Sequence, residues 1–321
     1  MNYTVLAENL TNPALLFFML GILAVTMKSD LEIPSNSSRF IALYLLFAIG
    51  FKGGQELAHE TFNTEIAWSL VFGLILSSAI PFYAYFILRW KLNAADAAAT
   101  AAAYGSVSAV TFVTAISFLE FHKLHSNGHM VAVMALMESP AIISGLLLLS
   151  LFKKDGTPHK MELGSVLKHA LTNGSVVLIL GSLIIGYIAN EKQAEGIKPF
   201  TNELFKGFLA IFLLDMGISS GKKLKSFFSY GWFPIAFAMI FPLVNGSIVA
   251  TLSPLFTPKL GDQFIFSVLA ASASYIAVPA AMKVSAPQAN PGLFLPMALA
   301  ITFPINITLG FPIYYFLLTS S

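Results

Sequence analysis

Ten long runs of mostly apolar residues dominate this 321-residue sequence and constrain its fold more than any other feature. Each run approaches or exceeds the roughly 20 residues that an α-helix needs to cross a lipid bilayer. The runs cover residues 11–27, 36–51, 66–88, 94–118, 128–152, 169–190, 203–220, 231–253, 262–283 and 292–318. A run such as 178–188 is apolar almost throughout, whereas the strands of a membrane barrel alternate at every second residue. We therefore expect an all-α membrane protein with ten transmembrane helices.

The composition excludes a soluble protein and several kinds of active site. Charged residues make up 11% of the chain, less than half of the roughly 25% that is typical of soluble domains. The formal net charge of +2 provides no basic surface for nucleic acid. The sequence has no cysteine, no nucleophile elbow and no phosphate-binding glycine loop. We expect neither an enzyme nor an ATP-driven pump, with no catalytic residues, no metal site and no resident cofactor.

Lys and Arg are distributed unevenly between the two sides of the expected spans. Twelve of the 18 lie on the side of the connections that precede the even-numbered spans, and the other six are Lys52, Lys123, Lys192, Lys198, Lys206 and Lys259. The side richer in Lys and Arg usually faces the cytoplasm. This pattern predicts a multi-pass protein of the cell inner (plasma) membrane with both termini outside the cytoplasm.

A weak internal repeat relates the two halves of the chain. At an offset of 167 residues, Gly50, Gly54 and Leu57 match Gly217, Gly221 and Leu224; at an offset of 166, Asp96, Ser106 and Ser108 match Asp262, Ser272 and Ser274. Each half holds an odd number of spans, so the second half must be inverted, as in many secondary transporters. We expect a first five-helix repeat at 1–152, a cytoplasmic linker at 153–168 and a second, inverted repeat at 169–321. The alternative is a helical bundle with coincidental glycines and serines.

Hydroxyl groups and helix breakers gather in the middle of the fourth and ninth spans, near residues 105–111 and 272–279. A broken helix frees backbone polar groups, which lipid cannot satisfy, so such a break is tolerated where it lines a cavity or meets polar partners. Two broken helices facing each other would direct two N-termini, each carrying about half a positive charge, at one spot. This pattern predicts an anion site. The alternative is that the hydroxyls bond to their own helices or join neighbouring helices.

The arginines and the buried acids limit what this site could hold. Arg39 and Arg89 are the only arginines and lie at span ends, so we expect a small monovalent anion held without a guanidinium group. Glu138 and Asp215 lie inside spans, where ionisable residues are costly and mark functional sites. Each could carry a proton or face a cation; the alternative is a neutral acid that joins two helices. The histidines at 122, 125 and 129 have a spacing that resembles a metal motif, but we expect a solvated connection there.

Four short segments of this sequence together resemble those of a known protein family. They are Gly-Phe-Lys-Gly-Gly at 50–54, Gly-Ser-Val-Ser-Ala-Val-Thr at 105–111, Ala-Ser-Ala-Ser-Tyr-Ile-Ala-Val-Pro at 271–279 and Pro-Gln-Ala-Asn-Pro at 287–291. Together they resemble the cyanobacterial-type sodium-dependent bicarbonate transporter family and its uncharacterised bacterial relatives. The resemblance implies two inverted repeats with crossed discontinuous helices 4 and 9, as in bile-acid/sodium symporters, an elevator-type movement and a homotrimer. It implies that the anion binds among Gly105, Ser106, Ser108, Thr111, Ser272 and Ser274.

The sequence departs from this family at one position that matters for the coupling ion. The acidic residue of the family's second broken helix falls on Tyr275 here, and a neutral phenol is a poor Na⁺ ligand. Glu138 or Asp215 would then supply the charge, or the coupled ion would be H⁺. We expect a cation-coupled secondary transporter for a small anion, with bicarbonate as the first candidate. The alternatives are a Na⁺- or H⁺-coupled organic-anion symporter (for a monocarboxylate or a bile-acid-like molecule) and a membrane anion receptor. The expected partners are the bilayer, the anion and, as an open alternative, a cytosolic regulatory protein.

Overall fold

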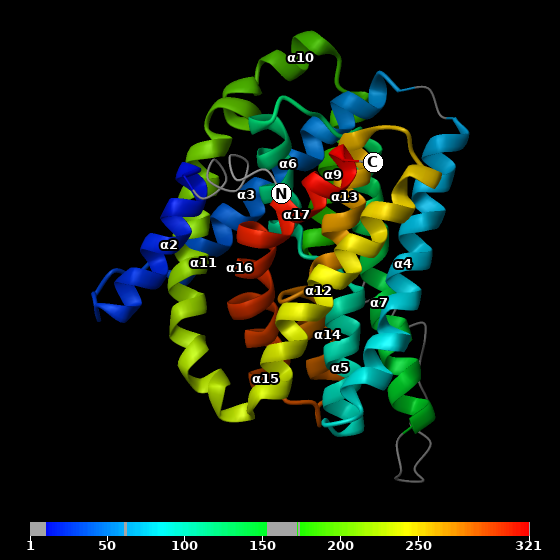
Figure 1. Cartoon of the computed structure of the whole chain (residues 1–321). Coiled ribbons are helices and arrows are strands. Elements are labelled where there is room, and N and C mark those ends of the chain that lie inside the picture. The colour runs from blue at the N-terminus through cyan, green and yellow to red at the C-terminus, as the bar shows by residue number, and fades with distance from the viewer. Residues whose placement is uncertain (1–10, 61–62, 153–171, 173, 321) are drawn as a thin grey trace.

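The computed structural model describes residues 11–60, 63–152, 172 and 174–320, and within these ranges every regular element is a helix (Figure 1). The first half contains α2 (Pro13–Thr26), α3 (Ser35–Ala58), α4 (Thr64–Leu88), α5 (Ala94–Gly105), α6 (Ala109–Phe121) and α7 (His129–Phe152). The second half contains α9 (Gly174–Ile188), α10 (Glu191–Glu195), α11 (Phe205–Phe227), α12 (Trp232–Leu252), α13 (Leu260–Ala271), α14 (Ala277–Ser285), α15 (Pro291–Pro296), α16 (Phe303–Ile305) and α17 (Phe311–Thr319). Short π-helical turns join α15, α16 and α17 into one stretch, Pro291–Thr319. The expected linker at 153–168 lies outside the described residues.

Seven described stretches are long and apolar enough to cross a membrane, with α5 and α6 (Ala94–Phe121) counted as one stretch and Pro291–Thr319 as another. Three further apolar helices are shorter, at Leu15–Thr26, Val176–Ile188 and Leu260–Ala271. Large apolar side chains are exposed along the outer helices, among them Trp68, Phe86, Ile185, Ile188, Trp232 and Ile240. Such a surface suits lipid rather than water. The chain is therefore an α-helical, multi-pass membrane protein.

Two short helices form the centre of the molecule. Every residue is buried from Ala97 to Gly105 in α5 and from Gly261 to Ala271 in α13. Alanine makes up most of α5, which allows the surrounding helices to approach it closely. The two helices that lead into the expected breaks are thus enclosed by protein, where irregular backbone can find polar partners.

Glycines set the distance within two outer helix pairs, α3 with α9 and α11 with α2. A Cβ atom on Gly54 would lie 2.1 Å from the carbonyl oxygen of Leu183 in α9, and Gly50 faces the same helix. A Cβ atom on Gly217 would lie 2.1 Å from the carbonyl oxygen of Phe18 in α2. Figure 1 shows α2 and α11 side by side at one flank. The absence of side chains at these glycines lets the two backbones touch.

Two aspartates anchor connections that are distant in sequence. The carboxylate of Asp262, at the start of α13, accepts hydrogen bonds from the backbone N–H of Asn127 at 2.6 Å and from its Nδ2 at 2.8 Å. The carboxylate of Asp96, at the start of α5, accepts one from the backbone N–H of Asn290 at 2.7 Å. Asn127 lies just before α7, and Asn290 just before α15. The start of α13 therefore fixes the start of α7, and the start of α5 fixes the start of the stretch Pro291–Thr319.

The histidine-containing connection before α7 is not wholly solvated, so the expectation for it was wrong at His129. This side chain is only 1% exposed, and its Nδ1 lies 2.9 Å from the Glu60 carboxylate. The end of α3 and the start of α13 cover it, because Glu60 and Asp262 both reach toward the start of α7. Within the described residues no cluster of His, Asp and Glu could hold a metal ion.

Replacing Asp262 with asparagine should lower the melting temperature of the purified protein. The new amide has only one acceptor oxygen, so one of the two Asn127 donors loses its partner at a fully buried site. A buried unpaired donor costs about 1–3 kcal/mol. Thermal unfolding in detergent measures the change. Glu32→Gln is the control, because the Glu32–Lys222 pair is mostly exposed at 3.7 Å and should contribute little. Equal melting of both variants would contradict the anchoring role.

Candidate functional site

The helical backbone is interrupted at both hydroxyl clusters. α5 ends at Gly105 and α6 begins at Ala109; α13 ends at Ala271 and α14 begins at Ala277. Gly105 is needed where it stands, because a Cβ atom there would lie 2.2 Å from the Pro81 ring of α4. The hydroxyl oxygen of Ser106 is buried and has no partner among the described residues.

A serine hydroxyl accepts a hydrogen bond from the first turn of the helix that follows each break. The hydroxyl oxygen of Ser108 accepts the Thr111 N–H at 3.2 Å and so caps α6. The hydroxyl oxygen of Ser274 accepts the Val278 N–H at 3.3 Å at the start of α14. Ser108 is the N-cap of α6, a position that serine favours because its hydroxyl satisfies an N–H group that the helix leaves free. Ser274 lies two residues before the N-cap of α14, Ile276, and its hydroxyl also satisfies a free N–H group.

The two breaks are hydrogen-bonded to each other. The Ser274 N–H donates to the Ala103 carbonyl at 2.8 Å, and the Ser108 N–H donates to the hydroxyl oxygen of Ser272 at 3.1 Å. That hydroxyl in turn donates to the Leu269 carbonyl at 2.9 Å. A backbone N–H group of each break is thus satisfied by the other break, which holds the two breaks together.

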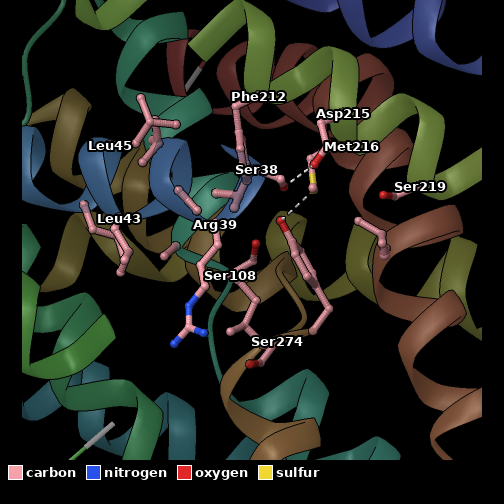
Figure 2. Close-up of a pocket in the computed structure, with 18 of the residues that line it drawn as sticks. Ser38, Arg39, Leu43, Leu45, Ser108, Phe212, Asp215, Met216, Ser219 and Ser274 are labelled. Atoms are coloured by element: carbon pink, nitrogen blue, oxygen red, sulfur yellow. Dashed lines mark hydrogen bonds between the residues drawn. The ribbon is translucent and has the colours of Figure 1, made fainter. Parts of the chain in front are cut away.

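A cavity of about 690 Å³ adjoins these breaks (Figure 2). Its wall combines serine hydroxyls, aliphatic and aromatic side chains, and both signs of charge. The charged residues of the wall are Glu32, Arg39, Glu138, Asp215, Lys222 and Lys223. Leu43, Leu46 and Phe212 contribute apolar surface. A cavity of this character can hold an anionic group beside a less polar one.

The cavity wall contains some of the residues expected from the sequence and not others. Ser108 and Ser274 line it, and so do Glu138, Asp215 and Tyr275. Gly105, Ser106, Thr111 and Ser272 are buried near the breaks and do not contribute to the wall. Among these four, Ser272 joins the two breaks through its hydroxyl.

The three candidates for the coupling ion come from two helices and from the break between α13 and α14. Asp215 of α11 accepts a hydrogen bond from the Ser38 hydroxyl of α3 (Figure 2). The Tyr275 hydroxyl donates to the sulfur of Met216 at 3.8 Å, and its electrostatic neighbours include Ser108 and Asp215. Asp215 therefore lies near Tyr275, the position at which the bicarbonate transporter family carries an acidic residue. Glu138 lines the wall from α7, two residues before Pro140.

The sequence reasoning missed one side of the cavity, the start of the second span. Arg39 lies at a span end, as expected, yet it lines the cavity (Figure 2). The reason is that α3 begins beside the cavity and presents one face along it. Ser35, Ser38, Arg39, Ala42 and Leu46 all line the wall at helical spacing. This polar-to-apolar stripe at the start of the second span was the signal available in the sequence.

Comparison with known proteins agrees with the resemblance. No individually curated protein matches the chain. A sequence profile described as the Na⁺-dependent bicarbonate transporter superfamily matches residues 13–319, nearly the whole chain. The match includes both breaks, the helices that supply the cavity wall and the close helix pairs at the flank. The chain therefore belongs to the Na⁺-dependent bicarbonate transporter superfamily.

Proposed function

We propose that this protein is a secondary active transporter for a small monovalent anion, with bicarbonate as the first candidate substrate. The observation that supports this most strongly is the pair of helix beginnings at Ser108 and Ser274, both on the wall of one cavity. A helix N-terminus offers free N–H donors and a partial positive charge, so two of them can hold an anion. Hydroxyls of the two serines can donate to the same anion.

The proposed architecture has ten spans in two inverted five-helix repeats, with helices 4 and 9 crossing at their breaks. Matched contacts support it. Gly50 and Gly54 face the sixth span, while Gly217 and Gly221 face the first. Asp96 of the fourth span binds the connection before the tenth, and Asp262 of the ninth binds the connection before the fifth. Each contact in one half thus has a counterpart five spans away, as an internal repeat requires.

The transport cycle is proposed to follow the elevator type, with a homotrimer in the membrane. The cavity extends from the breaks to Glu32, just before α3, and to Lys222, in the last part of α11. The Lys and Arg distribution assigns this side to the cytoplasm. On this proposal the present conformation faces inward and both termini lie outside. A cytosolic regulatory protein would meet the same side.

Asp215 is the proposed coupling-ion residue, with Glu138 as the second choice. Asp215 lies beside Tyr275, so a carboxylate is present near the anion site although the family's acidic position is a tyrosine. A bound cation there and an anion at the serines would stabilise each other. This proximity supports cation coupling through a residue on a different helix.

Replacing Na⁺ with choline should strongly reduce bicarbonate uptake into proteoliposomes that contain the purified protein. The measurement uses labelled bicarbonate at fixed concentration and at two pH values, with protein-free liposomes as the control. If uptake survives in choline but grows with an inward proton gradient, the coupled ion is H⁺. Absence of protein-dependent uptake of any small anion, under every gradient, would contradict the transport proposal.

The size of the cavity favours a second candidate, an organic-anion symporter. At about 690 Å³ the cavity lies within the roughly 300–1,000 Å³ typical of pockets for drug-sized ligands. Leu43, Leu46 and Phe212 would contact an apolar tail. Competition separates the candidates: monocarboxylates that displace labelled bicarbonate, and are themselves taken up, would favour the symporter for organic anions.

A further inference from the structure

Arg39, an exposed residue near the start of α3, lines the cavity and has no ion-pair partner in the part of the chain that the structure describes (Figure 2). The other arginine, Arg89, is not on the wall, and its guanidinium donates to the Leu92 carbonyl at 2.8 Å. A guanidinium group is always charged, so Arg39 brings a full positive charge to the cavity. Two arginines in one chain thus have different surroundings.

The carboxylates of the wall do not neutralise Arg39. Glu32 is paired with Lys222 at 3.7 Å, and Asp215 is bonded to Ser38. Glu138 forms no ion pair with a described residue. The Arg39 guanidinium is therefore available to a ligand.

The surroundings of Arg39 indicate the shape of that ligand. A guanidinium is flat and presents parallel N–H donors that match two oxygens on one carbon. The serines that begin α6 and α14 line the same cavity. Leu43 and Leu46, one and two turns further along α3, continue the same face with apolar surface.

We infer that Arg39 is the residue that recognises the transported anion, and that the anion carries a planar O–C–O group. Bicarbonate and organic monocarboxylates share this group. Arg39 donates to both oxygens of the group, and Ser108 and Ser274 donate to it from the two helix beginnings. A spherical anion such as chloride binds less tightly, because it cannot accept two parallel hydrogen bonds from the guanidinium on separate oxygens. This inference rests on the proposed transport function and names the chemistry by which the cavity selects its substrate.

The test compares Arg39→Gln and Arg39→Lys with Arg89→Gln in the full-length purified protein. Binding of bicarbonate, propionate and chloride is measured separately by isothermal titration calorimetry in detergent, and folding is checked by size-exclusion chromatography. Arg39→Gln should weaken binding of bicarbonate or propionate by about tenfold or more, as loss of charge-assisted hydrogen bonds predicts. Arg39→Lys keeps the positive charge but lacks the two parallel N–H donors, so this variant should lose the preference for these anions over chloride. Arg89→Gln should bind like the wild type.

The outcomes separate this inference from the proposed function. If the wild type binds and transports either anion and both Arg39 variants match it, the inference is wrong and the transporter stands. If the wild type neither binds nor transports any of the three anions, the proposed function fails and the inference with it. Tight binding of bicarbonate alone identifies it as the source of the O–C–O group, whereas propionate binding identifies an organic acid. If Arg39→Gln does not fold, the anion preference of Arg39→Lys decides, and an unchanged preference overturns the inference.

Discussion

Leucine at Gly186 should prevent normal folding or sharply lower stability, whereas leucine at Gly181 of the same helix should be tolerated. A Cβ atom on Gly186 would lie 2.2 Å from the carbonyl oxygen of Phe51 in α3. That atom belongs to backbone, so the two helices must separate before any side chain fits. No atom lies within 4 Å of a Cβ on Gly181. Overpacking costs about 1–3 kcal/mol and occasionally more, and backbone contact places this case at the upper end.

The experiment is a heated size-exclusion assay that compares the two variants with the wild type. Gly217 and Gly207 form a second matched pair, on α11. A Cβ atom on Gly217 would lie 2.1 Å from the Phe18 carbonyl oxygen, whereas no atom lies within 4 Å of a Cβ atom on Gly207. Similar losses at Gly186 and Gly217 would agree with the proposed repeat. If Gly186→Leu and Gly181→Leu have the same melting temperature, the close α3–α9 contact does not hold the protein together.

The apolar pattern predicted where the helices are, but it misplaced some of their ends. The second run was expected to end at residue 51, yet α3 continues to Ala58. Hydropathy falls at Lys52, but the helix goes on because Lys52 pairs with Glu120 at 2.6 Å and Gly54 packs against α9. These stabilising contacts join segments far apart in the chain. A window of local sequence contains none of them.

The same limit applies to the candidate site. Ser108 and Ser274 could be identified because hydroxyls and helix breakers in the middle of an apolar span are unusual. The role of Ser272 as the link between the breaks depends on the Ser108 backbone, 164 residues away. The polar-to-apolar stripe of α3 marks Arg39 in the sequence, but only the packing of α3 beside α6 and α11 brings that stripe to the cavity. The residue types of the site could be predicted from the sequence, but their arrangement in space could not.

Alanine at Ser108 or at Ser274 should reduce anion uptake by about tenfold or more while leaving most of the protein folded. Loss of the N-cap at Ser108, or of the Ser274 hydrogen bond to Val278, costs only about 1 kcal/mol, which a folded membrane protein can tolerate. Loss of a hydroxyl that donates to a bound anion removes a charge-assisted hydrogen bond worth about 1.5–3 kcal/mol. Uptake per folded protein in proteoliposomes, with the melting temperature measured in parallel, separates the two effects. Ser69→Ala is the control, since Ser69 is buried outside the cavity and its hydroxyl has no partner among the described residues.

Glycine at Ser108 distinguishes a cap from a ligand. Glycine is nearly as good an N-cap as serine, so Ser108→Gly should recover the stability that Ser108→Ala loses. It has no hydroxyl, so uptake should stay low if the Ser108 hydroxyl contacts the anion. Recovery of uptake together with stability would mean that Ser108 acts only by starting α6, which already bonds to it through Thr111. Unchanged uptake in both alanine variants would contradict the site itself, because the two hydroxyls on the cavity wall would then serve the helices alone.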